Sequence, residues 1–593
     1  MKKHNLFKVV GCLLLVLVLV SWFFKTADIT TSTDGKEFLF QDGSYIRIGI
    51  FSLLSFFAIG LQYFSHIALY ILCIGVLYGV LYKIPAYRRL LDYIADGFKE
   101  YEWIFIGMAM LGITLLVSMV GLQLAVLALF PLIISIILLL GYDRITAAMV
   151  TVGSVAVGLI GTVFSSSTAI GQSYFLNNAA NENVLIKIIL LVVSFAIMYV
   201  NTLMYAKKHK DNNEEDYGIL VPEKGEGKSS IIPVAIILDL TIIVLGLGFF
   251  SWDLFNIDIF QNISDKVINS TGVLSAFNAV IGATSDTVFG NWTLIEASVV
   301  LLIASGLLAL MYGMKFDEFL STAKKGAKKA LKPAFLVLLI YTSLIIVSNI
   351  PMQFSVIKPG LGGAANILVV ALIAIIFSII FVESQYAMKG ASTYLSTLTA
   401  NNSFILGLVF QAMYGLTTLF GVTSVPLMAT LAYLKINYFD WLKAIWKPAL
   451  ELLVVLLIIL TIVNGKNDKV VCKYTSDNGE ITLTATLNSS NELKEYQAKY
   501  HLIYSSEEEF NKACESAKVE DQTEKDGLKE ESSCDKKNKT LDYSYTFNIK
   551  NLNDENTNHD VLAEITQYAS EGKIDLDSWM QAAESQGFTC KKN

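Results

Sequence analysis

Charged residues are scarce in this sequence. Only 16% of its 593 residues are Asp, Glu, Lys or Arg, whereas 54% are hydrophobic. Ordinary globular domains carry about 25% charged residues. The composition therefore excludes a single soluble enzyme and a nucleic-acid-binding protein, and it predicts a polytopic protein whose surroundings are the lipid bilayer.

Motifs for nucleotide and metal chemistry are also absent. No Gly-x-x-x-x-Gly-Lys-[Ser/Thr] phosphate loop occurs, and the sizeable loop Lys207–Ser230 is too short for a nucleotide-binding domain. The apolar part has neither a paired His/Glu metal motif nor a Ser/His arrangement. We therefore expect no enzymatic activity, no metal site and no cofactor beyond a coupling ion, Na⁺ or H⁺.

Proline, arginine and cysteine are unevenly distributed. Residues 466–593 contain no proline and no arginine but four of the six cysteines, and they hold 16 Lys against 25 acidic residues. This contrast predicts a lipid-embedded bundle followed by a charged soluble domain. The expected parts are membrane half one (1–206), a cytoplasmic loop (207–230), membrane half two (231–464) and an extracytoplasmic domain (465–593).

Several apolar runs have the length of one membrane crossing, about 20 residues. The first begins after basic residues like a signal peptide, but no small-residue cleavage site ends it, so we expect a retained anchor. The expected crossings are Leu6–Phe24, His66–Lys83, Val184–Ala206, Ile231–Phe250, Thr293–Met314, Ala334–Ile350 and Ala449–Val463.

Basic residues set the expected orientation. Six segments hold 22 of the 29 Lys and Arg residues that precede position 466. If they face the cytoplasm, the N-terminus is inside the cytoplasmic membrane and the tail is outside. Two of these segments, Pro85–Tyr101 and Lys315–Lys332, are amphipathic, and we expect them to lie on the membrane surface. The six segments are 1–8, 83–100, the Arg144 loop, 207–230, 315–332 and 435–447.

Four other apolar runs do not fit one simple crossing. With this orientation, Trp103–Tyr142 must start and finish inside, and Asn366–Asn401 must start and finish outside, so both are expected hairpins. Ile145–Asn181 and Phe404–Tyr433 each cross once around a polar interruption. Hairpins that enter from opposite sides imply an inverted repeat.

Three groups of residues carry a family resemblance. They are Gly141–Thr146 followed by Gly153, Gly158 and Gly161; Phe410–Gly415 followed by Val422–Ala429; and Tyr438–Lys443. In this order and spacing the sequence resembles the YfcC-type carriers over residues 1–464. These are relatives of the anaerobic dicarboxylate and aminobenzoyl-glutamate transporters in the ion transporter superfamily.

The resemblance implies an all-α membrane fold with two re-entrant hairpins and two broken helices. It also implies elevator-type movement of a transport domain against a scaffold, often in a homodimer. Family members are linked to carboxylates, amino acids or short-chain acids, by symport with sodium or protons or by antiport. The hairpin tips of this sequence differ from those of the relatives, so substrate and coupling ion do not follow from the resemblance.

Hydroxyl groups cluster at both expected breaks. Unwound backbone at the membrane midplane persists only where it lines a cavity, and hydroxyl oxygens suit a hard cation such as sodium. The alternative is that these hydroxyls bond neighbouring backbone. The candidates are Ser165, Ser166, Ser167 and Thr168 at the first break, and Thr417, Thr418, Thr423 and Ser424 at the second.

Polar residues at the hairpin tips are further candidates for substrate or ion binding: Ser118, Gln123, Glu383, Ser384 and Gln385. A charge inside the bilayer usually faces a cavity or a partner, so Glu383 either pairs with Lys389 or binds a zwitterionic substrate. Alternatively, this tip lies at the outer interface and Glu383 is solvated.

Asp239, in the middle of an apolar run, is a candidate for proton coupling. A buried, hydrogen-bonded aspartate without a transport role is the equal alternative.

The tail is expected to be a small α+β domain. Glu480–Leu487 alternates like a strand, and a helix is expected to end at Asp577–Met580. Two disulfides are expected, with three possible pairings among Cys472, Cys514, Cys534 and Cys590.

Two functions remain in competition. The first is a secondary active transporter for a small organic anion or amino acid. The second is a non-transporting membrane receptor or scaffold that kept the carrier fold, with the acidic tail as the functional part.

Overall fold

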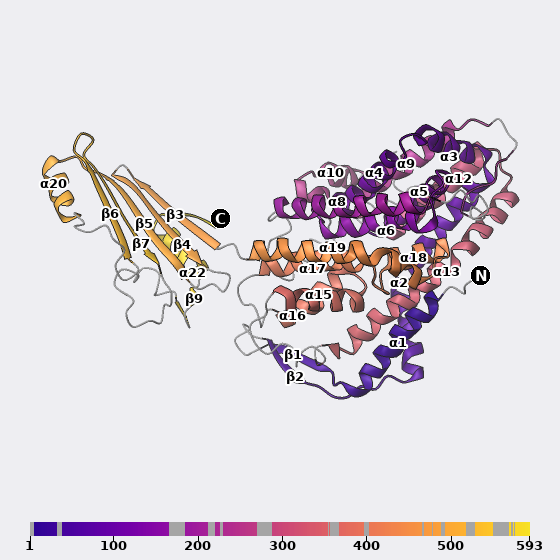
Figure 1. The fold of residues 1–593 in the computed structure, drawn as a ribbon, viewed down its shortest axis with the longest axis horizontal. Coiled ribbons are helices and arrows are strands. Elements are labelled where there is room, and N and C mark those ends of the chain that lie inside the picture. Colours follow the sequence, from indigo (N-terminus) through magenta and orange to yellow (C-terminus); the bar gives the residue numbers. More distant parts are fainter. Residues whose placement is uncertain are drawn as a thin grey trace. The chain divides into compact units, whose positions relative to one another are not determined.

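The computed structural model of the chain forms two compact units, one within residues 1–459 and the other built mainly from Leu460 onward (Figure 1). The first unit is helical and the second contains an antiparallel sheet. The described residues are 5–31, 38–164, 184–210, 220–225, 229–269, 288–353, 355, 367–395, 403–464, 468–476, 478–487, 493–517, 528–548, 569–570, 573–574 and 576–592.

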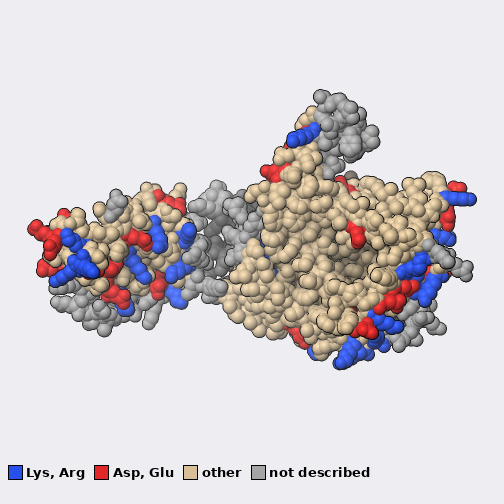
Figure 2. Space-filling model, turned by 90° about the horizontal axis from the view of Figure 1, so that it is seen from above, with Lys and Arg blue, Asp and Glu red and all other residues tan. Residues whose placement is uncertain are grey.

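Within the described residues, eight helices are long and apolar enough to cross a membrane. Every expected single crossing overlaps one of them. Figure 2 shows a broad uncharged surface on this unit, with charged side chains gathered along one edge. The spans are α1 (Leu6–Phe23), α2 (Ile50–Lys83), α4 with η1 (Glu102–Val120), α8 (Val184–Lys208), α9 (Ile232–Phe249), α12 (Leu294–Met311), α13 (Phe316–Asn349) and Tyr438–Val463 of α19 (Tyr438–Asn464).

Helices α2 and α13, each 34 residues long, pack with their backbones in close contact. A Cβ atom on Gly326 would lie 2.1 Å from the carbonyl oxygen of Gly75, and one on Gly79 would lie 2.9 Å from the Cα of Gly326. Small residues permit this approach. Lys315–Lys332 is not a separate helix, because it continues through Pro333 as the first half of α13, with Gly326 and Ala330 buried. Its expected place on the membrane surface stays a prediction.

Pro85–Phe98, by contrast, is a separate helix, α3. It buries Ala86, Tyr87, Leu91 and Ala95 at helical spacing, as an amphipathic segment should.

The first hairpin runs from α4 (Glu102–Leu115) through the π-helical turn η1 (Leu116–Val120) and η2 (Ala125–Leu129) to α5 (Phe130–Leu139). Gly121 turns the chain with φ of 81°, a conformation that favours glycine. The Tyr142 hydroxyl donates a 2.7 Å hydrogen bond to Glu102, so the segment ends where it began. Helix α6 (Arg144–Ile160) follows, capped by Asp143.

The second hairpin pairs α15 (Ile367–Phe381) with α16 (Ser384–Leu395), and a broken helix follows it. At the hairpin tip Val382 has φ of 66°, and the Glu383 amide donates to the Phe381 carbonyl at 2.6 Å. The broken helix consists of α17 (Ser403–Thr417) and α18 (Val425–Leu434). The remaining elements of this unit are β1 (Ala27–Thr31), β2 (Phe38–Asp42), η5 (Trp252–Phe255) and α10 (Ile259–Ile268).

The C-terminal unit is a six-stranded antiparallel sheet in the order β10-β3-β4-β5-β7-β6. Trp579 of α22 (Leu576–Ser585) packs into its core. The expectation of a helix ending at Asp577–Met580 is wrong, because that turn begins α22. The strands are β3 (Asp468–Ser476), β4 (Gly479–Leu487), β5 (Leu493–Ile503), β6 (Leu528–Asp535), β7 (Thr540–Asn548) and β10 (Thr589–Lys592); β8 (Ala569–Ser570), β9 (Lys573–Ile574) and α20 (Glu507–Ser516) complete the unit.

Both expected disulfides are present in this unit. Cys472 pairs with Cys590 and joins the adjacent strands β3 and β10, while Cys514 pairs with Cys534. The structure thus selects one of the three pairings that the sequence left open.

Candidate functional site

The first break begins where α6 ends at Ile160 in the interior of the helical unit. Ser118, at the turn of the first hairpin, binds the unwound residues after α6 through both its side-chain hydroxyl and its backbone carbonyl. Its hydroxyl donates to the Gly161 carbonyl at 2.7 Å, and its own carbonyl accepts from the amides of Val163 and Phe164 at 3.0 and 3.2 Å. The predicted site residue Ser118 is therefore hydrogen-bonded directly to the break.

Gln411 of α17 closes the same break from the second half of the chain. Its amide nitrogen donates to the carbonyls of Ile160 and Thr162, both at 3.0 Å. The side chain is only 1% exposed. Because the last carbonyls of a helix lack partners within that helix, Ser118 and Gln411 together supply donors to three consecutive carbonyls at the end of α6.

Glycines permit the close contact of these segments. A Cβ atom on Gly415 would lie 2.3 Å from the Ile160 amide nitrogen, and one on Gly158 would lie 2.9 Å from the Thr114 carbonyl oxygen. Gly161 is similarly close to Leu191 of α8. The first hairpin, α6, α8 and α17 thus meet at one point with little room for additional side-chain atoms.

Helix α17 also reaches the second hairpin. The Tyr414 hydroxyl donates to the Val382 carbonyl at 3.1 Å. Gln411 and Gly415, one turn apart, face α6, whereas Tyr414 faces the hairpin tip. One helix therefore connects the first break with the tip of the second hairpin.

Glu383, at that tip, accepts two hydrogen bonds. Tyr341 of α13 donates to one carboxylate oxygen, and Gln385 donates to the other at 3.0 Å. His66 of α2 lies within electrostatic range. The hydroxyl of Ser384, which begins α16, is buried and has no hydrogen-bond partner among the described residues. The carboxylate is thus held between the hairpin and the long helix α13.

The hydroxyls of the second break are bonded to backbone. Thr417 and Thr418 both donate to the Tyr414 carbonyl, at 2.8 and 3.1 Å, and Thr423 donates to the Ile379 carbonyl of α15 at 2.5 Å. Ser424 caps α18 by accepting from the Leu427 amide. A hydroxyl that donates its proton still has lone pairs that can accept or coordinate, so these contacts are compatible with either interpretation of the cluster.

Two aromatic residues of α19 satisfy carbonyls in this break. The Trp441 indole donates to the Leu419 carbonyl at 2.7 Å, and the Tyr438 hydroxyl donates to the Phe420 carbonyl. Trp441 is fully buried. The second break is thus closed by the helix that follows it in the sequence.

The other predicted site residues lie apart from this cluster or outside the described residues. Gln123 follows the first hairpin's turn, where its backbone N–H donates to the Gly121 carbonyl. Asp239 is exposed on α9, on the helix face that also exposes Ile236, Leu240 and Ile243. Ser165, Ser166, Ser167 and Thr168 lie outside the described residues.

Sequence reasoning did not name Gln411, Tyr341, Tyr414, Tyr438 or Trp441 as site residues. Gln411 is an isolated amide in an apolar stretch of α17, and that isolation is an available signal. Tyr341 is followed by Thr342 and Ser343 in α13, so no such signal marks it. Gln411 lies about 250 positions from its partners Ile160 and Thr162 in the sequence, so no local pattern identifies these partners.

Known proteins provide a family and two weak structural likenesses. The YdaH transporter of Alcanivorax borkumensis aligns with 77% of this chain and 97% of its own at 11% identity and a TM-score of 0.37. MtrF of Neisseria gonorrhoeae, described with a class of antimetabolite efflux pumps, aligns with 78% and 95% at 12% identity and 0.34. Likenesses at these scores carry no further argument.

No curated protein sequence matches the chain. The sequence model of the DcuC family, the C4-dicarboxylate anaerobic carriers, does match it, over residues 58–465. This match covers most of the chain and confirms the family resemblance, which was expected over residues 1–464, from residue 58 onward. The chain belongs to the C4-dicarboxylate anaerobic carrier family and is a multi-pass membrane transport protein.

Proposed function

We propose that this protein is a secondary active transporter that moves a small organic anion across the cytoplasmic membrane, with its N-terminus inside and its tail outside. A C4-dicarboxylate is the first candidate substrate, because the family is named for carriers of such anions; amino acids are the second. The convergence of Ser118 and Gln411 on the unwound end of α6 carries the proposal. It is a polar, helix-free point inside an apolar unit, where a carrier needs its site.

We propose that the substrate carboxylate lies between this break and the second hairpin. The N-terminus of a helix favours an anion, and α16 begins at Ser384, whose buried hydroxyl has no hydrogen-bond partner among the described residues. The lone pairs of Thr417, Thr418, Thr423 and Ser424 are candidate ligands for Na⁺. Glu383 is a better candidate for proton coupling than Asp239, because it connects a hairpin tip to α13.

Alternating access would move the hairpins and broken helices against the α2–α13 pair. In both halves a hairpin is followed by a helix that ends in unwound residues, α6 after α4–α5 and α17 after α15–α16, and this supports an inverted repeat. The expected continuation of the first broken helix lies outside the described residues. Elevator movement and a homodimer complete the proposal, since they belong to the resemblance described above.

Proteoliposomes containing the purified protein test this function. We expect uptake of labelled succinate or another member of a carboxylate and amino-acid panel, driven by a sodium gradient, a pH gradient or counterflow. Gln411→Leu should abolish uptake, because the break loses two donors. Thr151→Val is the matched control, since Thr151 is a buried hydroxyl in α6 that bonds only its own helix.

Absence of flux across the whole panel would contradict the proposal. Deletion of residues 466–593 separates it from the receptor hypothesis. A carrier keeps its uptake without the acidic tail, whereas a receptor that acts through the tail loses its function.

A further inference from the structure

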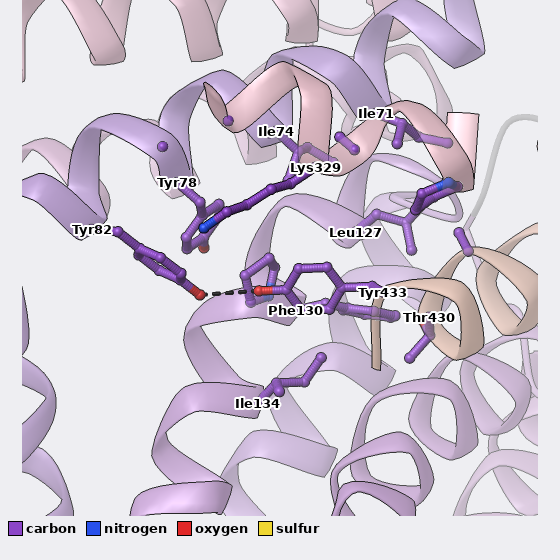
Figure 3. A pocket seen from close by; sticks show the side chains of 17 residues that line it. Ile71, Ile74, Tyr78, Tyr82, Leu127, Phe130, Ile134, Lys329, Thr430 and Tyr433 are labelled. Carbon is purple, nitrogen blue, oxygen red and sulfur yellow. Dashed lines mark hydrogen bonds between the residues drawn. The ribbon is translucent and has the colours of Figure 1, made fainter. Parts of the chain in front are cut away.

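A cavity lies between the α2–α13 pair on one side and η2, α5 and α18 on the other (Figure 3). Its volume is about 90 Å³, below the range of about 300–1,000 Å³ for sites of drug-sized ligands, so it admits only a small or narrow ligand. Ser118, Gln411 and the residues of the second hairpin do not line it. It is therefore a different place from the proposed transport site.

The cavity wall is almost entirely apolar, with one cation. Isoleucines, a leucine, a phenylalanine, prolines and glycines make up most of it. Figure 3 shows the Lys329 side chain extending toward Tyr78 and Tyr82. Its ammonium lies 5.7 Å from the centre of the Tyr82 ring, a cation–π contact. Among the described residues, no carboxylate pairs with Lys329.

The tyrosine hydroxyls of the cavity are already hydrogen-bonded. Tyr78 donates to the Ala128 carbonyl at 2.7 Å, Tyr82 donates to the Leu220 carbonyl at 2.9 Å, and Tyr82 and Tyr433 are joined at 3.0 Å. The Thr430 hydroxyl differs. It is buried in the wall and has no hydrogen-bond partner in the described part of the chain. A buried hydroxyl without a partner is costly, and an aliphatic chain along this wall would leave that cost unchanged.

The mouth of the cavity leads into a polar groove. The two share Gly79, Tyr82, Gly326 and Lys329. Four lysines and two glutamates line the groove, so it carries a net positive charge that attracts anions. Lys435 lies near enough to Lys329 for the two cations to interact unfavourably. An anion at the mouth would relieve that repulsion.

We propose that this cavity binds a straight-chain aliphatic monocarboxylate, with the carboxylate at Lys329 and the hydrocarbon chain along the apolar wall. The single cation selects one carboxylate, because a second carboxylate deeper in the wall would be a buried charge without a cation to pair with, which is costly. Entry through a charged groove favours a free carboxylate over a bilayer phospholipid. The binding does not depend on the proposed transport function.

Equilibrium binding of radiolabelled octanoate to the full-length protein in phosphatidylcholine nanodiscs tests this site. We expect saturable binding that Lys329→Gln weakens at least tenfold. Lys328→Gln is the matched control, because Lys328 lines the groove but not the cavity, and it should change the affinity less than twofold. Lys329→Arg should retain binding, and Thr430→Val should change the affinity less than twofold, because the hydrocarbon chain makes no hydrogen bond there.

Competitors define the ligand and its source. Unlabelled octanoate should displace the label, whereas octanedioate, which carries a second carboxylate, should not. Nanodiscs with added anionic phospholipid should leave octanoate binding unchanged. Equal losses in Lys329→Gln and Lys328→Gln, displacement by octanedioate as strong as by octanoate, or displacement by anionic phospholipid would each overturn the proposal. Melting curves of both variants without ligand show that any loss is not a loss of folding.

Discussion

The helical unit and the sheet unit use the same side chains in different ways. Gln411 is fully buried and binds two backbone carbonyls at a helix end, whereas Gln497 is half-buried and binds the Thr546 hydroxyl across two strands. Tyr341 and Tyr543 each donate to a glutamate, but the first is fully buried and the second is partly exposed. In the helical unit, buried polar side chains satisfy backbone carbonyls at a helix end or a buried carboxylate. In the sheet unit, the polar side chains are partly exposed, so water can take the place of a lost hydrogen-bond partner.

The comparison predicts that the sheet unit owes much of its stability to its two disulfides. Cys472–Cys590 joins residues 118 positions apart and Cys514–Cys534 residues 20 apart. On loop length, the double Ser variant of the first pair should lose about 4–5 kcal/mol of unfolding free energy, and that of the second about 3 kcal/mol. Urea unfolding of residues 466–593, followed by the fluorescence of Trp579, measures both. A larger loss from the shorter loop would contradict the argument.

The next largest effect is expected from Gln411, whose replacement should cost more stability than that of Gln497. Gln411→Leu leaves two buried carbonyls without donors, at about 1–3 kcal/mol each, so the helical unit should melt markedly earlier and lose transport. Gln497→Leu should cost about 0.5–1.5 kcal/mol in the sheet. Thermal unfolding of the two variants in the same full-length protein compares them. Similar costs would show that burial does not set the difference.

The two tyrosines test the charged partners. Tyr341→Phe removes a donor from Glu383 and should cost about 1.5–3 kcal/mol, as hydrogen bonds to charged groups do. Tyr543→Phe removes the donor to Glu530, where solvent substitutes, and should cost about 0.5–1.5 kcal/mol. Uptake assays add a second measurement, since only the Tyr341 variant should change transport. An effect on uptake from Tyr543→Phe would break the separation between the units.

The smallest effect is expected at an exposed ion pair. Hydrogen bonds from Lys473 and Thr482 hold the pKa of Glu480 below its ordinary value. A lowered native pKa means that the pair stabilises the sheet at neutral pH, and that this contribution is lost as the pH falls through the lowered value. Lys473→Met should therefore destabilise residues 466–593 slightly at pH 7 and less at pH 3. An equal effect at both values would exclude this electrostatic cause.

Periodicity and composition predicted the membrane crossings and the first hairpin well. Run lengths located the crossings, because about 20 apolar residues are a physical requirement of the bilayer. They did not predict that Lys315–Lys332 joins α13, since this depends on Gly75 and Gly79, which lie on another helix. Likewise, four cysteines in the tail predicted two disulfides, but their pairing follows from strand order, which local patterns do not contain.

The candidate site was predicted only in part, for a related reason. The hydroxyl cluster at Thr417–Ser424 marked the second break, whereas the first cluster lies outside the described residues. The donors to the unwound carbonyls come from distant segments: Ser118, Gln411, Tyr438 and Trp441. A break in a helix is a local feature of sequence, whereas its closure is a property of the packed structure. The isolated polar residue in an apolar helix is the signal to use for finding such partners.

The tip of the second hairpin stores conformational energy. Val382 is β-branched, yet it has φ of 66°, a region that such residues rarely occupy. Backbone in such a region costs on the order of 1–3 kcal/mol and persists only where its surroundings enforce it; here the side chain is buried and Tyr414 holds the carbonyl. Any rearrangement that returns Val382 to extended backbone recovers that energy, so the strained tip favours such a rearrangement. Val382→Gly should remove the strain, because glycine adopts positive φ readily.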